Sequence, residues 1–187
     1  RAILHMLGNT EVERKFLLAR KPDFRNSTLR RAEPFFIEQI YLSGFDEGVS
    51  RIRRRSSLRH GGGRSQGDST AYYMAKKSEI STGVRREEDG LISYYDYEHL
   101  KSFKDLNRAV VRKRRHCFIY NNQYFELDEF ISPKWARGMW GLEVELLNID
   151  DPIDLPPFLD IAKEVTDDPA YSNYEIAKRS FDKLRIN

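Results

Sequence analysis

The sequence has one cysteine, Cys117, among its 187 residues. A single cysteine excludes an internal disulfide and a zinc site built from several thiolates, and it fits a reducing compartment. No apolar run approaches the roughly 18–20 residues of a membrane-spanning helix, and the first residues lack the charged-then-apolar order of a secretory signal. We therefore expect a soluble, cytoplasmic protein with no membrane partner.

A strong excess of one charge is also missing, because 32 Lys and Arg face 29 Asp and Glu, for a formal net charge of +3. That balance argues against a protein that coats nucleic acid. A nucleic-acid partner is expected only if it presents a 5′-triphosphate end. Charged residues still make up 33% of the chain, so their local pattern has to indicate the function.

The length suits a single domain over residues 1–187, since one core commonly occupies about 100–200 residues. Residues 1–5 are interpreted as a linker ahead of Met6 and are left out of the fold prediction. Segments rich in β-branched and aromatic residues predict strands at 11–18, 35–42, 49–55, 71–77, 90–95, 109–120, 124–131 and 141–147.

Helical spacing of apolar residues is confined to two stretches, 97–106 and 156–184, the second of them interrupted by an Asp-Asp-Pro break. Both are predicted to form packing helices without a chemical role. A turn is predicted at the asparagine pair 121–122, and a long hairpin loop from Gly61 to Asp68. The chain is therefore predicted to be α+β, with helices flanking a sheet.

Charged residues recur at alternate positions in several predicted strands, so they share one face of each strand. On a single strand such a face is usually in contact with water. Its repetition on strands far apart in the sequence favours a closed antiparallel barrel, in which helices cover the apolar outer face and the charged faces meet inside. The alternating sets are Glu11, Glu13 and Lys15; Arg51, Arg53 and Arg55; Lys113 and Arg115; Glu126 and Asp128; and Glu143 and Glu145.

A charged interior cannot be dry, because unpaired buried ions cost several kcal/mol each. Clustered carboxylates attract divalent cations, and ligands that are all oxygen favour Mg²⁺ or Mn²⁺ over zinc. Arginine and lysine beside them require an oxygen-rich anion, since the guanidinium fork matches the geometry of phosphate. Acidic and basic faces in one tunnel therefore indicate a metal-complexed polyphosphate.

The segment EVERKF resembles the ExExK signature of the CYTH, or triphosphate tunnel metalloenzyme, superfamily, through Glu11, Glu13 and Lys15. Further segments resemble later motifs of that superfamily, in the same order across nearly the whole chain: VSRIRRR, YYMAKK, VRREEDGLI, VRKRR, FELDEF, GLEVEL and EVTDDPAYSNYEIA. Two of them depart from the pattern. YYMAKK lacks the threonine of the motif and leaves Lys76 and Lys77 as alternative registers, and Asp89 replaces a glutamate.

The resemblance implies an eight-stranded antiparallel tunnel and metal-dependent hydrolysis of triphosphates. It also implies roles for individual residues. Mg²⁺ or Mn²⁺ would be held by Glu11, Glu13, Glu126, Glu143 and Glu145. The triphosphate would be bound by Lys15, Arg51, Arg53, Lys76, Arg85, Lys113 and Arg115. The chemistry of hydrolysis adds the candidates for catalysis: Glu143 or Glu145 would orient or deprotonate the water, and Lys15 or Lys76 would pair with phosphate or transfer a proton.

The expected substrate is a small-molecule triphosphate. Inorganic tripolyphosphate is the first choice, because nothing in the sequence defines a pocket for a base or a thiazolium ring, and nucleoside or thiamine triphosphate comes next. The resemblance leaves open a class IV-type adenylate cyclase. From a different class, a noncatalytic module that binds polyphosphate or triphosphate is the alternative, and both a monomer and a homodimer remain open.

Other residue types offer weaker candidates for a site. His60, His99 and His116 share no metal-ligand spacing with acidic or thiol partners, and His5 falls in the expected linker. Cys117 and His116 are neighbours in a strand and so face opposite ways, which argues against a Cys–His nucleophile. Trp135 and Trp140 are expected to pack in the core or at the rim, with contact to the organic part of a substrate as the alternative.

Overall fold

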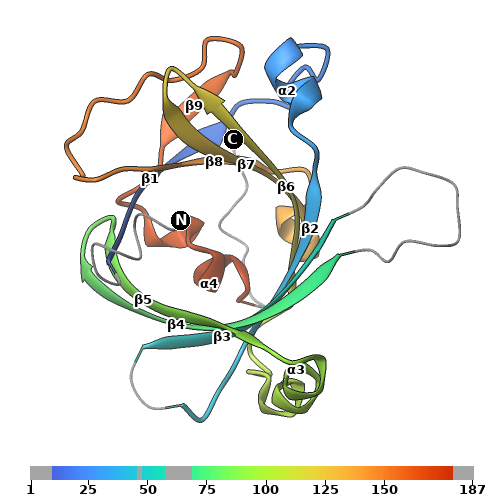
Figure 1. Ribbon diagram of the computed structural model, residues 1–187. Helices are drawn as coiled ribbons and strands as arrows, with labels where there is room; N and C mark the ends of the chain where they lie inside the picture. Colours follow the sequence, from blue (N-terminus) through green and yellow to red (C-terminus); the bar gives the residue numbers. More distant parts are fainter. Residues whose placement is uncertain (1–9, 46–47, 58–68, 179–187) are drawn as a thin grey trace, which may run out of the picture.

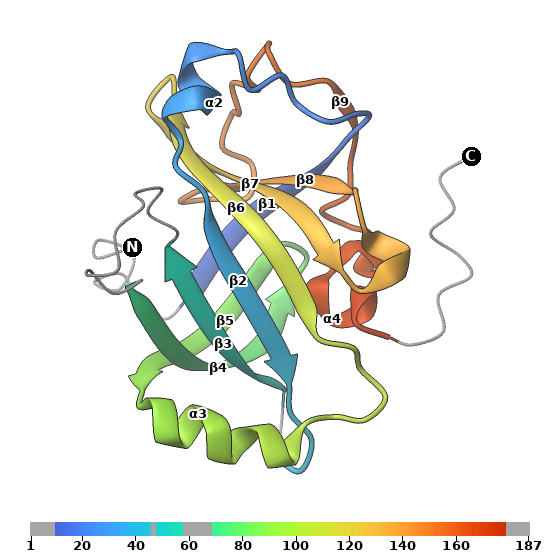
Figure 2. The same cartoon turned by 90° about the vertical axis from the view of Figure 1, so that its right-hand side faces the viewer.

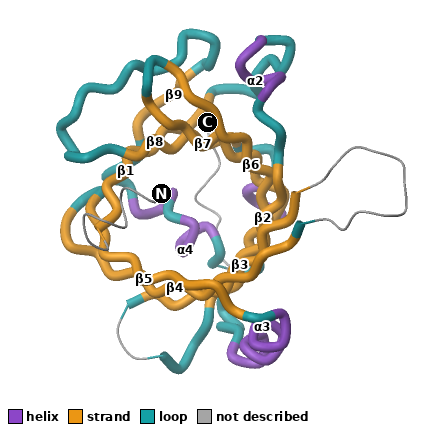
Figure 3. Tube along the Cα trace, viewed as in Figure 1, coloured by secondary structure: helices purple, strands orange, loops and turns teal. Residues whose placement is uncertain are grey.

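The computed structural model describes residues 10–45, 48–57 and 69–178. Strands β1 to β8 form an antiparallel sheet that closes on itself, because β5 pairs with β1 as well as with β4. Figure 1 and Figure 3 show the strands as a closed ring, whose inner side is called the lumen. The strands are β1 (Thr10–Leu18), β2 (Phe35–Tyr41), β3 (Val49–Ser57), β4 (Thr70–Ser81), β5 (Val84–Ile92), β6 (Val111–Tyr120), β7 (Gln123–Ser132) and β8 (Trp140–Glu145).

Short elements surround this barrel. They are α2 (Ser27–Arg31), α3 (Tyr94–Leu100), η1 (Lys101–Phe103), η2 (Lys134–Ala136), β9 (Ile161–Glu164), η3 (Pro169–Tyr171) and α4 (Asn173–Ile176). The predicted fold class, α+β with a closed eight-stranded antiparallel barrel and flanking helices, is therefore confirmed. The predicted loop from Gly61 to Asp68 lies outside the described residues, as does His60. No helix in the described ranges is long and apolar enough to cross a membrane.

The turn between β6 and β7 shows how the sequence sets the strand register. Asn121 and Asn122 have positive φ angles of 44° and 61°, a conformation that asparagine adopts more readily than most residues, and they form a two-residue hairpin connection. The predicted turn is confirmed. The hairpin that it starts places Arg115 opposite Asp128, so these charged side chains share the lumen face.

The strand predicted at 90–95 is wrong in its position. β5 ends at Ile92, and α3 follows it directly. The hydroxyl of Ser93 accepts a hydrogen bond from the backbone N–H of Asp96 at 3.0 Å, and this N-cap starts the helix. α3 then packs against the outer face of β2 and β3 through the buried Tyr97.

The prediction of helices over 156–184 is also wrong for most of its described part. β9 pairs with β1 from Phe16 to Leu18, while β5 covers the same edge of β1 only near its start. Arg14 of β1 donates hydrogen bonds of 2.7 and 2.8 Å to Glu164 of β9. The open edge of β1 needs backbone partners, and this requirement prevails over the helical spacing. Only α4 is helical at this end, and residues 179–187 lie outside the described ranges.

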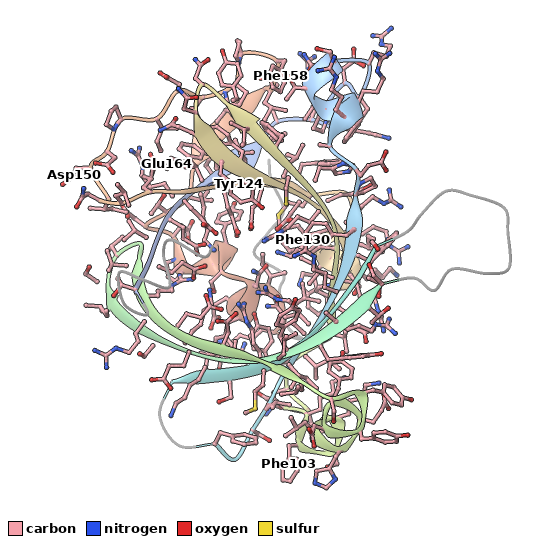
Figure 4. All side chains as sticks on the ribbon, viewed as in Figure 1. Phe103, Tyr124, Phe130, Asp150, Phe158 and Glu164 are labelled. Atoms are coloured by element: carbon pink, nitrogen blue, oxygen red, sulfur yellow. The ribbon has the colours of Figure 1, made fainter. Side chains whose placement is uncertain are left out.

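Apolar packing is concentrated on the outside of the barrel wall. The largest cluster lies on the outer faces of β1, β6, β7 and β8 and includes Leu142, with Leu29 of α2 and Phe158 packed over it. In Figure 4, Phe158 lies outside the wall and Phe130 projects inside. A smaller cluster joins Phe130 to Ile176 of α4, and Figure 2 shows α4 at one end of the barrel. The middle of the lumen is left to charged residues.

Candidate functional site

A cavity of about 480 Å³ occupies the barrel interior, and each of the eight strands contributes to its lining. Figure 4 shows the side chains that crowd this interior. The wall supplies the carboxylates Glu11, Glu13, Glu126 and Glu143 and the cations Lys15, Arg51, Arg53, Lys77, Arg85 and Arg115. The charged strand faces therefore meet inside the barrel, as their spacing indicates.

Strand register brings carboxylates from neighbouring strands together. Glu13 lies opposite Glu145, and Lys15 lies opposite Glu143, across the β1–β8 pair. Glu126 lies opposite Glu143 across the β7–β8 pair. Residues directly opposite one another share a face, with Cβ atoms about 4.5–5.5 Å apart. Four of the five expected metal ligands thus form two facing pairs on one side of the lumen.

Lys15 is held between two carboxylates. Its Nζ lies 2.9 Å from Glu13 Oε1 and 3.1 Å from Glu143 Oε1. Burial alone would lower the pKa of Lys15, but the two carboxylates outweigh burial and hold that pKa above its ordinary value. Lys15 therefore stays an ammonium ion, which suits it to bind phosphate oxygens and makes it a poor proton acceptor.

Arg115 is the centre of a dense ion-pair cluster. Its guanidinium donates to Glu126, to Asp128 at 2.6 and 2.7 Å, and to Glu143 at 3.2 Å. Burial alone would raise the pKa of Glu143, but the charges of Lys15 and Arg115 hold it well below its usual range. Glu143 is therefore ionised at neutral pH.

Lys113 faces inward on β6 but does not contribute to the cavity lining. Its side chain is 1% exposed, and its Nζ lies 2.5 Å from Asp128 Oδ2. Burial lowers the pKa of Lys113 to about 8, although Asp128 opposes that shift. The structure thus pairs Lys113 with Asp128 and does not place it where the sequence predicted a phosphate contact.

A second cluster of ion pairs lies on β1, β3, β4 and β5. Lys77 Nζ lies 2.5 Å from Glu11 Oε2 and 3.1 Å from Glu87 Oε2, and Arg51 Nη2 lies 3.0 Å from Glu87 Oε1. The Nε of Arg51 is buried without a hydrogen-bond partner among the described residues. Buried polar groups are nearly always hydrogen-bonded. Arg51 also lines the cavity, but this N–H is sealed from solvent, so an anion would reach it only after the side chain shifts.

Arg53 and Arg85 complete the basic lining. Arg85 Nη1 lies 3.3 Å from Glu13 Oε1, which links the second cluster to the carboxylate that also holds Lys15. Arg53 shares a face of β3 with Arg51, because alternate residues of a strand point the same way. Both were expected to bind triphosphate, and the structure places both at the cavity.

Lys76 does not face the cavity, and the preferred register of β4 is wrong by one residue. Val49 lies opposite Lys77 across β3–β4, and Lys77 lies opposite Glu87 across β4–β5. Opposite residues share a face, so Lys77 joins Arg51 and Glu87 inside the barrel while Lys76 points outward. The binding and catalytic roles expected of Lys76 are therefore reassigned to Lys77, the alternative that YYMAKK allowed.

The C-terminal segment also lines the cavity, which its helical spacing did not indicate. It contributes the carboxylates of Asp167, Asp168 and Glu175. Arg108 fixes the segment in place, because its Nη1 donates to the Tyr174 carbonyl at 2.5 Å and its guanidinium lies 3.2 Å from the centre of the Tyr174 ring. The resemblance of EVTDDPAYSNYEIA to the C-terminal motif was the one signal for these residues, and it carried no roles for them.

The tryptophans do not face the middle of the lumen. Trp140 belongs to the outer apolar cluster, so contact with the organic part of a substrate in the lumen is excluded for it. Trp135 Nε1 donates to the Ile176 carbonyl at 2.9 Å and so supports α4. Cys117 lies opposite Glu126 on the lumen face, while His116 faces outward, and the expectation that these neighbours cannot form a nucleophile pair holds.

Within residues 10–45, 48–57 and 69–178, no three or more His, Cys, Asp or Glu side chains are arranged to hold a metal ion by themselves. The carboxylates inside the barrel instead contact cations, as Glu13 contacts Lys15 and Glu143 contacts Arg115. Their oxygens are nevertheless the donors that Mg²⁺ and Mn²⁺ prefer. Mg²⁺ commonly binds through one or two carboxylates and completes its shell with water and substrate phosphates, and this donor set fits that mode.

Acid should weaken the fold through these ion pairs. Burial alone would raise the pKa of Glu87, but Lys77 and Arg51 lower it from 4.5 to about 2. A carboxyl whose pKa is lower in the folded chain stabilises the fold fully above about pH 4.5 and loses that contribution as the pH falls through about 2. We expect the free energy of unfolding, measured by urea titration, to fall across this interval.

The variant Glu87→Gln removes the titrating carboxyl with little change of shape. One pKa unit corresponds to about 1.4 kcal/mol, so the fall in unfolding free energy between pH 4.5 and 2 should shrink by about 2–3 kcal/mol. Glu88→Gln, at an exposed position of the same strand, should leave the fall unchanged. Equal pH dependence in wild type and Glu87→Gln would contradict the ion pairs assigned to Glu87.

Comparison with known proteins adds to this geometry. No protein-family model and no curated protein matches the sequence. Two solved structures of NE1496, one described as a hypothetical protein and the other as an inorganic triphosphatase, are 28% identical with a TM-score of 0.53, and they cover 89% of this chain and 97% and 93% of theirs. A candidate adenylate cyclase from Bacillus halodurans shares the fold at 14% identity and a TM-score of 0.50, over 75% of this chain and 83% of that one.

The match to NE1496 extends over nearly the full length of both chains. In this chain the barrel brings the motif residues together, from the EVERKF strand to the C-terminal segment at the cavity. Because the ordered motifs of the sequence fold into this one charged tunnel, the chain belongs to the CYTH, or triphosphate tunnel metalloenzyme, superfamily.

Proposed function

We propose that this chain hydrolyses inorganic tripolyphosphate inside the barrel, with Mg²⁺ or Mn²⁺. The coarser assignment, a hydrolase of the phosphoanhydride bonds of triphosphates, is supported by the similarity to a structure described as an inorganic triphosphatase. The observation that carries the proposal is the cavity itself, in which arginines and lysines from five strands share one lumen with glutamates. Carboxylates beside these cations are the donors that a divalent metal would need alongside a triphosphate.

The cations of the lining account for binding of the phosphate chain. Arg51, Arg53, Arg85 and Arg115 present planar guanidinium groups, which bind phosphate oxygens in pairs, and Lys15 and Lys77 add point charges. Most of these cations already hold a carboxylate in the chain without substrate. Binding would therefore exchange carboxylate partners for phosphate oxygens, and a shift of the Arg51 side chain toward the substrate would also give its buried Nε a partner.

The carboxylates released by that exchange are the candidates to hold the metal. Glu11, Glu13, Glu126, Glu143 and Glu145 share the lumen, and a divalent cation bound to them would neutralise charge on the phosphate oxygens. Mg²⁺ usually divides its coordination shell between such carboxylates, water and the phosphates of the substrate. We therefore infer that metal and triphosphate bind together.

The hydrolysis itself forms a bond from water oxygen to the terminal phosphorus and breaks the bond from that phosphorus to the bridging oxygen. Phosphate and pyrophosphate are the products, and the proton of the water leaves with phosphate oxygens or solvent. Glu143 is ionised and can orient the water or hold the metal, but its low pKa makes it a weak base. Lys15, protonated between two carboxylates, stabilises charge and does not abstract the proton.

A substrate panel with and without chelator tests this proposal. We expect phosphate release from tripolyphosphate to exceed release from ATP and thiamine triphosphate, to stop in excess EDTA, and to return with Mg²⁺ or Mn²⁺. Undiminished release in EDTA would refute the metal requirement. Saturable tripolyphosphate binding without turnover would instead identify a binding module, and formation of cyclic AMP from ATP would identify a cyclase.

A further inference from the structure

A second cavity, of about 390 Å³, lies on the outside of the barrel wall. It is formed between the segment that carries α2 and the outer faces of β6, β7 and β8, and Figure 2 shows that segment running along the outside of the barrel beside β6. His116 and Trp140 are the most deeply buried residues of its lining, at 6% and 4% exposure. Because His116 and Cys117 point to opposite sides of β6, the wall of the barrel separates this cavity from the lumen.

Three rings build the inner surface of this outer cavity. The centre of the Phe24 ring lies 4.6 Å from that of His116 and 5.7 Å from that of Trp140. The His116 and Trp140 rings are 6.4 Å apart and inclined by 29°. Such a set offers a flat apolar ligand several aromatic faces and edges to pack against. A volume near 390 Å³ is at the lower end of the range of small-molecule sites, about 300–1,000 Å³.

Two polar atoms in this cavity have no partner in the described part of the chain. His116 Nδ1 lies 2.9 Å from the Ala32 carbonyl, and a carbonyl only accepts, so Nδ1 carries the proton. Burial lowers the pKa of His116, so the ring is neutral and its Nε2 is an acceptor. Trp140 Nε1 is a donor. Within the described residues, neither His116 Nε2 nor Trp140 Nε1 makes a hydrogen bond. Solvent reaches both atoms, because the unpaired side-chain atoms that are sealed from solvent there all belong to arginines.

Buried tryptophan N–H groups usually find a partner, and these two atoms can find theirs only in a ligand or in water. One donor and one acceptor on neighbouring aromatic rings are complementary to a ligand edge that carries an acceptor beside a donor. We propose that the outer cavity binds a planar heteroaromatic ring with such an edge, as nucleobases have. Stacking of a base on an aromatic side chain tolerates every base, so the site need not be selective among them.

The charges at the mouth do not require a charged ligand. Arg114 Nη1 already donates to Glu129 Oε2 at 2.8 Å, and the other two charged residues of the lining, Lys21 and Glu33, are exposed and opposite in sign. A cationic ligand without an acceptor would leave Trp140 Nε1 unpaired, and an apolar ligand would leave both atoms unpaired. Neutral nucleosides are therefore the appropriate probes, and they lack the phosphates that would direct a ligand into the lumen.

Titration of the whole chain with adenosine, guanosine, cytidine and uridine tests the proposal. We expect saturable one-to-one binding of at least one nucleoside by calorimetry, with a shift of the Trp140 indole N–H resonance. Trp140→Phe keeps a ring but removes the donor, and it should weaken binding about fivefold, the effect of one neutral hydrogen bond. Trp135→Phe, which removes the indole that donates to Ile176, should leave the affinity unchanged.

The lumen provides the decisive control, because the proposal does not depend on hydrolysis there. Saturating tripolyphosphate and the lumen variant Arg53→Ala should leave nucleoside affinity unchanged. Displacement by tripolyphosphate, or loss of binding in Arg53→Ala, would place the nucleoside in the tunnel and overturn the proposal. Absence of saturable binding by all four nucleosides to the folded wild-type chain, with no shift of the Trp140 resonance, would mean that the cavity holds water only.

Discussion

Replacing Glu143 with glutamine is expected to reduce tripolyphosphate turnover by about 10²–10³-fold, the usual effect of removing one group that stabilises charge at a reacting centre. Glu143 is the carboxylate that lies opposite Glu126 and contacts both Lys15 and Arg115. Glutamine keeps its shape but removes the charge that would hold a metal or orient water. The fold should survive, because Lys15 keeps Glu13 and Arg115 keeps Asp128. Steady-state kinetics together with thermal unfolding measure both effects.

Glu38→Gln is the matched control for this variant. Glu38 is 12% exposed where Glu143 is 15% exposed, and it also serves two cations, Arg112 at 2.9 Å and Arg54 at 3.7 Å. It lies on the outer face of β2, so its loss should lower stability without lowering turnover. Equal turnover in wild type and Glu143→Gln would remove Glu143 from the catalytic residues.

The sequence predicted the parts of this site that depend on strand parity. Arg51 and Arg53, or Glu143 and Glu145, lie two residues apart, and a period of two leaves only the choice of face. Closure of the sheet then decides which face points inward. The alternate apolar residues, such as Leu142 and Val144, have to be covered by elements outside the barrel, so the charged face points into the lumen. The lumen face of most strands was predictable for this reason.

Where two charged residues are adjacent in the sequence, this argument could not decide which of them faces the lumen. Lys76 and Lys77 differ by one position, and parity distinguishes them only when the partner strand is known; the pairing of Lys77 with Val49 and Glu87 supplies that knowledge. The strand β9 was missed for a related reason. Its formation depends on the open edge of β1, which is a property of the assembled barrel and not of residues 161–164 themselves.

The carboxylates of the lumen are paired with cations in the free protein. A cluster of glutamates suggests mutual repulsion, so that Glu11→Ala would be neutral or slightly stabilising. Glu11 instead lies 2.5 Å from Lys77 Nζ, and Glu13 contacts Lys15 and Arg85. The glutamates and the cations of the lumen neutralise one another until substrate and metal separate them. Ion pairing of this kind could not be read from one strand at a time, because every pair joins two strands.

Adjacent arginines on β3 provide the last and sharpest test of the lumen face. Arg53 lines the cavity, whereas Arg54 is 45% exposed on the outer face and lies 3.7 Å from Glu38. Arg115 is a less clean choice, because its removal would also leave Glu126, Asp128 and Glu143 without their shared cation. Substituting Arg53 or Arg54 by alanine therefore makes the same chemical change on the inner and on the outer side of the barrel wall.

Arg53→Ala should reduce kcat/KM for tripolyphosphate by about tenfold to a hundredfold, since a charge-assisted hydrogen bond is typically worth about 1.5–3 kcal/mol. Arg54→Ala should stay within about twofold of wild type, because it loses only a partly exposed ion pair. The kinetics also assign the role of Arg53: a higher KM at constant kcat marks a contact made equally with bound substrate and transition state, while equal falls in kcat and kcat/KM mark a contact made only in the transition state. If Arg54→Ala were the damaging variant, the opposite face of β3 would point into the lumen. Arg51 and Arg53 would then both lie outside the site.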